Sequence, residues 1–129
     1  MNALLLKESF DLIAPTKDEF AEAFYNRLFE KYPATRGFFA KTDMTKQARA
    51  LAATLAVVVA GVEKGEDLVP TLQSLGGRHK TYGVVPEHYP IVGEILIETF
   101  KTTLGDKWTL SYEDAWVQAY TVIAGVMSA

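Results

Sequence analysis

The chain has 129 residues, of which 49% are hydrophobic, and it contains two histidines and no cysteine. This length and composition suit one domain with a substantial core, so we expect residues 1–129 to form a single domain and we exclude disorder. The lack of cysteine excludes disulfides, thiolate zinc sites and iron–sulfur clusters, and the net charge of −3 argues against nucleic acid or an anionic membrane as a partner.

The sequence carries no targeting or membrane signal that we can identify. Its longest uncharged run, residues 50–62, is too short to span a bilayer. The N-terminus lacks the basic start and the long apolar stretch of a signal peptide. We therefore expect a cytoplasmic protein without stable membrane association, and the acidic surface permits a monomer or a weak homodimer.

The pattern predicts helices throughout, because no segment alternates apolar and polar residues between turn signals. Pro15 ends the first helix, and a capping box at residues 16–19 begins the second. Pro33 suits the first turn of a short helix, and Gly83 and Gly105 end later ones. In chain order the expected helices cover about residues 2–14, 17–31, 33–39, 45–63, 68–82 and 86–104, with a last one from residue 110 or 112 onward.

One histidine lies on the apolar face of its predicted helix. Leu68, Leu72, Leu75, His79 and Tyr82 follow steps of three and four residues, which place them on one inward stripe. A histidine in this place is either a core residue bonded to a carbonyl or hydroxyl, or a metal ligand. No second His, Asp or Glu shares its spacing, which disfavours a zinc or di-iron site. A lone imidazole ligand fits best when a macrocycle such as haem supplies the other iron bonds.

Several motifs, taken in order, resemble those of bacterial single-domain globins related to the haem domain of flavohaemoglobins. The matching segments are FYNRLF at 24–29, KYP at 31–33, RGFF at 36–39, QARAL at 47–51, RHK at 78–80, GV at 83–84, HYPIVG at 88–93 and DAWVQAY at 114–120. The resemblance implies an all-α, three-over-three globin fold around one b-type haem, five-coordinate when ferrous and without a gas ligand. A shortened two-over-two globin is the alternative, which the 32 positions between Gln47 and His79 disfavour.

The resemblance also implies a role for individual residues. His79 corresponds to the proximal ligand of the haem iron, and Phe39 to the ring that packs against the porphyrin. Tyr25 and Gln47 correspond to the polar pair on the distal side, where the gas binds. Leu51, one turn after Gln47, corresponds to the apolar residue over the iron.

On the proximal side, Tyr89 corresponds to a tyrosine that hydrogen-bonds behind the proximal histidine. His88 beside it is expected to be exposed. Arg49 and Arg78 are candidates to meet the haem propionates, which favour cations near the rim. The rest of the pocket is expected to be lined by Leu75, Val84, Val92, Trp116 and Tyr120.

Three functions follow from the resemblance. The first is reversible binding of O₂ or another diatomic gas for delivery, storage or scavenging. Donors at Tyr25 and Gln47 would stabilise the partial negative charge of bound O₂ and so favour O₂ over CO. The second is a nitric oxide dioxygenase that depends on an external reductase, and the third is a haem-based sensor or signalling module. NO, CO, sulfide and nitrite are alternative ligands.

Overall fold

The computed structural model describes all residues, Met1–Ala129, and contains six α-helices and no strand. The all-α prediction is therefore confirmed. The α-helices are α1 (Ala3–Ile13), α2 (Lys17–Lys31), α3 (Met44–Lys64), α4 (Val69–Thr81), α5 (Tyr89–Leu104) and α6 (Leu110–Ser128). Four 3₁₀ turns join them, namely η1 (Ala14–Thr16), η2 (Pro33–Phe39), η3 (Pro86–His88) and η4 (Gly105–Lys107).

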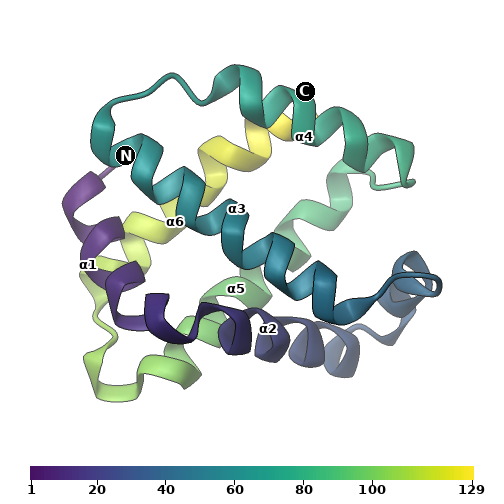
Figure 1. The fold of residues 1–129 in the computed structure, drawn as a ribbon, viewed down its shortest axis with the longest axis horizontal. Coiled ribbons are helices and arrows are strands. Elements are labelled where there is room, and N and C mark those ends of the chain that lie inside the picture. The colour runs from purple at the N-terminus through teal and green to yellow at the C-terminus, as the bar shows by residue number, and fades with distance from the viewer.

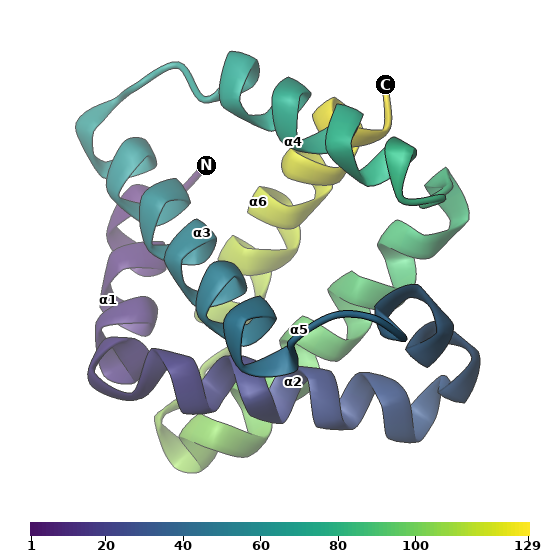
Figure 2. The same ribbon diagram turned by 45° about the vertical axis from the view of Figure 1, so that its right-hand side comes forward.

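The helices pack in two layers, as the three-over-three arrangement predicts. Helices α1, α3 and α4 form one layer, and α2, α5 and α6 form the other (Figure 1). Helix α2 runs along one end of the molecule, where it packs against α3 and α5. At the opposite end α4 crosses α6, as the turned view makes plain (Figure 2). The connection between α3 and α4 begins at Gly65, whose φ of 69° gives the left-handed end of α3.

The centre of the core is aromatic and contains one polar link. The ring of Phe100 lies 4.7 Å from those of Phe20 and Trp116 and stacks at 5.0 Å on that of Trp108. The buried Trp116 Nε1–H donates to Ser9 Oγ at 2.7 Å, and the Ser9 hydroxyl lies 2.7 Å from the Leu5 carbonyl, to which it donates. These two hydrogen bonds satisfy the indole donor inside the core and connect α6 to α1.

Helix α4 approaches α6 more closely than side chains would allow. A Cβ atom built on Gly76 would lie 2.2 Å from the carbonyl oxygen of Met127. The neighbouring Gly77 faces open space, with nothing within 4 Å of the same position. Only a glycine at residue 76 therefore lets the two backbones meet.

Two local expectations need correction. The capping box at residues 16–19 is wrong, because Thr16 ends η1 and its Oγ1 donates back to the Ile13 carbonyl instead of capping α2. The short helix predicted from Pro33 is present but has the tighter 3₁₀ geometry. No helix combines the length and the apolar character that a bilayer crossing demands.

The contact at Gly76 gives a stability prediction with a matched control. We expect Gly76→Ala to lower the free energy of unfolding by about 1–3 kcal/mol, because the new methyl group forces α4 away from α6. Gly77→Ala should leave stability unchanged or raise it by up to about 1 kcal/mol, because alanine favours the helix. Urea unfolding of both variants measures the difference, and equal stabilities would contradict the backbone contact.

Candidate functional site

A cavity of about 530 Å³ lies between the two layers and brings the predicted pocket residues together. It is lined by 26 residues, of which 20 are hydrophobic, from α2, η2, α3, α4, α5, α6 and the segment between α4 and α5. Every residue that the resemblance places in the pocket lines it: Tyr25, Phe39, Gln47, Leu51, Leu75, His79, Val84, Tyr89, Val92, Trp116 and Tyr120. Their individual roles stay predictions.

His79 lies in the last turn of α4 with one ring nitrogen engaged. Its Nδ1 is 2.8 Å from the carbonyl oxygen of Leu75, one turn earlier. A carbonyl oxygen only accepts, so Nδ1 carries the proton and the neutral ring keeps a lone pair on Nε2. This backbone bond fixes both the tautomer and the ring orientation, which suits Nε2 for binding a metal ion.

Tyr25 and Gln47 meet inside the same cavity, from α2 and α3. Gln47 Nε2 donates to Tyr25 Oη at 2.9 Å. The phenol therefore accepts from the amide, and its own proton remains available for another acceptor. Burial raises the pKa of the Tyr25 phenol, against a smaller lowering by the Gln47 bond, so the phenol is protonated at neutral pH.

An aromatic wall holds Tyr25 in place. Its ring makes edge-on contacts with Phe24 at 5.1 Å and Phe39 at 5.4 Å. Phe39 also lies 5.5 Å from Phe29, whose outer face is covered by the Arg36 guanidinium at 4.7 Å. These contacts leave the Tyr25 ring little freedom to turn, so the direction of its hydroxyl is set by packing.

The hydrogen bonding behind His79 differs from the expectation for Tyr89. The partner of His79 Nδ1 is the Leu75 carbonyl and not the Tyr89 hydroxyl, because a carbonyl one turn back on the same helix is already within reach. Tyr89 instead accepts through its backbone carbonyl, to which Tyr120 Oη donates at 2.7 Å. Burial raises the pKa of both phenols, so both are neutral near pH 7.

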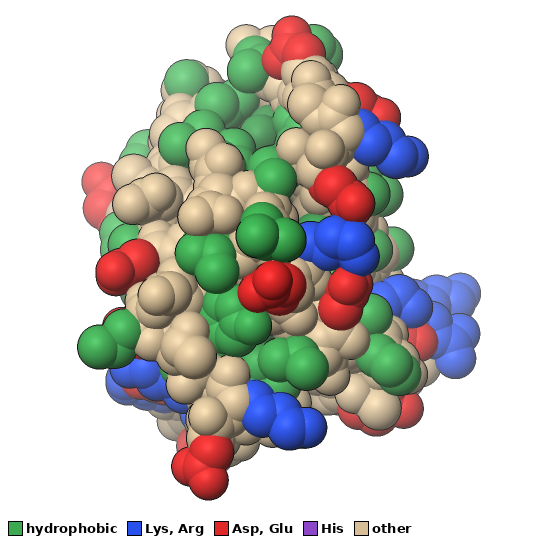
Figure 3. Space-filling model, turned by 90° about the vertical axis from the view of Figure 1, so that its left-hand side faces the viewer, with side chains coloured by type: hydrophobic (Ala, Val, Ile, Leu, Met, Phe, Trp, Pro, Cys, Tyr) green, Lys and Arg blue, Asp and Glu red, His purple; other side chains and the backbone are tan.

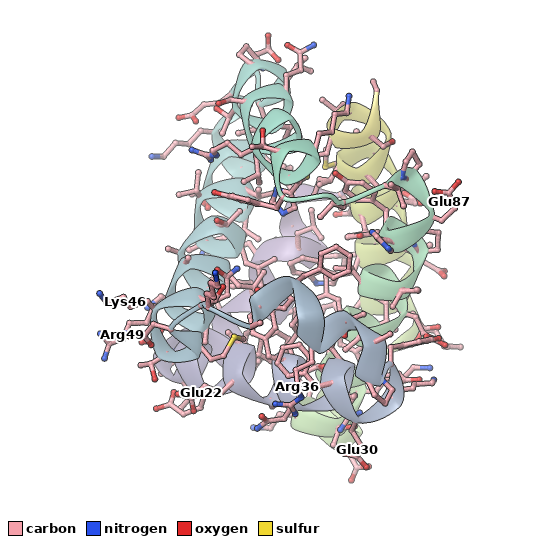
Figure 4. The ribbon with its side chains drawn as sticks, turned by 90° about the vertical axis from the view of Figure 1, so that its right-hand side faces the viewer. Glu22, Glu30, Arg36, Lys46, Arg49 and Glu87 are labelled. Atoms are coloured by element: carbon pink, nitrogen blue, oxygen red, sulfur yellow. The ribbon has the colours of Figure 1, made fainter.

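Three residues lie elsewhere than the sequence predicts. Tyr82 follows the end of α4, and its side chain is 68% exposed at the rim of the cavity instead of pointing into the core. Arg49 and Arg78, the candidates for the propionates, are exposed and do not line the cavity. Arg49 points away from the interior, as does Lys46 on the same helix (Figure 4).

Sequence reasoning also missed residues that line the cavity. Leu55 and Val58 lie on the same face of α3 as Leu51, as their helical spacing predicts, but the sequence analysis did not assign them to the pocket. Thr42 and His88 line the cavity from segments outside the α-helices, where no periodicity marks an inward direction. His88 is half-buried, and not exposed as expected.

The residues present fit a haem group. The cavity is mainly apolar, as a flat macrocycle requires, and its volume lies within the range of cofactor sites. A bare ion would need several protein ligands, but the structure contains no group of three His, Cys, Asp or Glu residues able to hold one. His79 would supply one nitrogen ligand to the iron, and the macrocycle would supply the others.

Comparisons with known proteins agree with this geometry. The chain is 32% identical over 122 residues to a flavohemoprotein of Bacillus subtilis and 36% identical over 132 residues to one of Oceanobacillus iheyensis. These alignments cover 93% and 95% of the chain but only 31% and 32% of the relatives, so the chain spans about a third of their length.

Solved structures match the fold closely. A bacterial globin from Campylobacter jejuni superposes with a TM-score of 0.83 at 26% identity, covering 98% of this chain and 91% of that one. An engineered carbene transferase, a putative nitric oxide dioxygenase from Rhodothermus marinus, superposes with a TM-score of 0.86 at 27% identity, covering 98% and 87%. The family model described as Globin matches residues 22–127. The chain therefore belongs to the globin family, which implies a haem cofactor.

Proposed function

We propose that this globin reversibly binds O₂, or another diatomic gas, at a five-coordinate b-type haem, for oxygen delivery, storage or scavenging. The observation that carries this proposal is the Gln47–Tyr25 hydrogen bond inside a mainly apolar cavity. It leaves a neutral phenol with an uncommitted proton in a place that is mostly free of competing polar groups. When bound, haem supplies an iron atom to which diatomic gases bind reversibly.

His79 is the residue that we propose to hold the iron. Its Nδ1–H is committed to the Leu75 carbonyl, so only Nε2 is available as a ligand. A neutral acceptor behind the ring makes the imidazole less electron-donating than a carboxylate would. This arrangement suits the binding and release of a gas more than the cleavage of an O–O bond.

Tyr25 and Gln47 are the residues that we propose to stabilise the gas ligand. The Tyr25 hydroxyl would donate to the outer atom of the ligand, while Gln47 holds the phenol oxygen from the other side. O₂ gains more from such a donor than CO does, because it carries more negative charge on its outer atom. Leu51 and the aromatic wall would keep bulk water from competing for the phenol proton.

Replacing the ligand residue tests the haem site. We expect His79→Ala to lose stable haem binding, because the variant lacks the imidazole nitrogen that we propose as the iron ligand. Titration of the purified variant with haem, followed by its Soret absorption, measures the loss, and added imidazole should restore a five-coordinate ferrous spectrum. Far-ultraviolet circular dichroism checks that the variant remains helical. Unchanged haem affinity would rule out His79 as the ligand.

Replacing the distal phenol tests the gas site. We expect Tyr25→Phe to speed O₂ release about tenfold, the equivalent of one hydrogen bond of about 1.4 kcal/mol, with a smaller effect on CO release. Tyr32→Phe is the matched control, because the Tyr32 hydroxyl donates to Glu94 outside the cavity. Stopped-flow release rates compare the variants. Equal O₂ release from Tyr25→Phe and the wild type would remove Tyr25 from this role.

A second function, nitric oxide dioxygenase, is favoured by the names of the relatives, which include flavohemoproteins and a putative nitric oxide dioxygenase. In this reaction NO, O₂ and one electron give nitrate, so sustained turnover needs a reductase. We expect the O₂-loaded protein alone to form at most one nitrate per haem. Repeated turnover with NADH and an added flavin reductase, measured as nitrate, would favour the enzyme. A third function, that of a sensor or signalling module, would be favoured if the wild type binds no haem.

A further inference from the structure

The polar side chains that line the cavity divide into those with a partner and those without one. Four donors are already committed to backbone carbonyls: Thr35 to Tyr32, Thr54 to Ala50, His79 to Leu75 and Tyr120 to Tyr89. Gln47 donates to Tyr25, and the Trp116 indole donates to Ser9. The donors that remain uncommitted belong to Tyr25, Thr42, Tyr82, His88 and Tyr89.

Exposure separates these five into an inner and an outer set. Tyr25 and Tyr89 are buried, with 7% and 9% of their surface exposed. Thr42 and Tyr82 are exposed and His88 is half-buried, although all three line the cavity. The outer set therefore marks the place where the cavity opens to solvent, between the α4–α5 connection and the η2–α3 connection. Neither histidine appears on the left-hand side of the molecule, which carries scattered apolar and charged side chains (Figure 3).

His88 is held at this opening in one tautomer. The Val85 backbone N–H donates to His88 Nδ1 at 3.1 Å, so the neutral ring carries its proton on Nε2. The edge of the Phe38 ring packs against the same imidazole, with 5.0 Å between the centroids. Both contacts fix the ring in the absence of a ligand. A ligand that accepts a hydrogen bond from Nε2–H therefore costs this side chain little conformational entropy.

Tyr82 lies on the same rim, at the C-terminal end of α4. It is the C-cap residue of α4, three positions after His79, and both residues line the cavity. The residue is 68% exposed, and its hydroxyl has no hydrogen-bond partner in the protein. An exposed aromatic side chain at the mouth of a mainly apolar cavity, with an unpaired hydroxyl at its tip, can contact the edge of a ligand and donate to it.

Haem carries two carboxylates, which must stay near water when the macrocycle enters an apolar cavity. The basic residues that the sequence suggested for them do not line the cavity, and Arg49 points away from it (Figure 4). We propose that His88 Nε2–H and the Tyr82 hydroxyl bind the haem carboxylates at the rim. This inference rests on the proposed haem binding and adds the residues that hold the polar edge of the cofactor.

The test compares haem with haem dimethyl ester, in which both carboxylates are blocked. Each form is loaded on the full chain, and its loss to excess apomyoglobin is followed by absorption. We expect Tyr82→Phe and His88→Phe each to speed the loss of haem about threefold to tenfold, the scale of one ordinary hydrogen bond. Neither substitution should change the loss of the dimethyl ester.

Three further variants make the comparison specific. Tyr32→Phe removes a hydroxyl that bonds Glu94 outside the cavity, and Arg49→Met and Arg78→Met remove the rejected cations. We expect all three to lose haem at the wild-type rate. The proposal is overturned if the Tyr82 and His88 variants lose haem and its ester faster to the same extent, which would mean a structural effect. It is also overturned if these two variants lose haem at the wild-type rate, whether or not the Arg49 or Arg78 variants lose it faster.

Different results would contradict haem binding through His79 and carboxylate binding at the rim. If the wild type shows no Soret band that depends on His79, haem binding itself is wrong and the rim assignment falls with it. If the wild type binds haem through His79 and loses the ester no faster than haem, only the rim assignment is wrong.

Discussion

Helix α4 is held against the rest of the molecule mainly through α6, where the backbone at Gly76 meets the carbonyl of Met127. Only Leu72 and Gly76 of this helix are buried, so little else fixes its position. His79 lies three residues beyond this contact and takes its place in the cavity from it. A haem bound through His79 would add the apolar contacts that α4 otherwise lacks, and binding to the folded state alone stabilises that state by mass action.

Two hydrogen bonds inside the cavity have a defined donor and a defined acceptor. The Leu75 carbonyl accepts a hydrogen bond from His79 Nδ1–H and leaves Nε2 free, while the Gln47 amide donates to the Tyr25 oxygen and leaves the phenol proton free. In each case one hydrogen bond to the protein decides which atom faces a ligand. Burial then keeps the Tyr25 phenol protonated, so it acts as a donor at neutral pH.

The two leading functions use the same cavity and differ in what happens outside it. A phenol donor, an apolar wall and one imidazole serve gas binding and nitrate formation alike. The difference is the supply of electrons, because repeated nitrate formation needs a reductase and gas binding does not. For this reason the experiments that separate the functions measure turnover with a reductase as well as ligand release.

The sequence by itself determined the helices, because apolar spacing together with Pro15, Pro33 and Gly105 marks them locally, and its ordered motifs pointed to the residues that line the cavity. It could not determine which hydrogen bonds those residues make. The partner of His79 is a backbone carbonyl, which no side-chain motif encodes, and the failed cap at Thr16 has the same cause. His88 and Thr42 lie outside the α-helices, and Tyr82 lies just past the end of one, so their directions were decided by the tertiary packing of the chain around the cavity mouth.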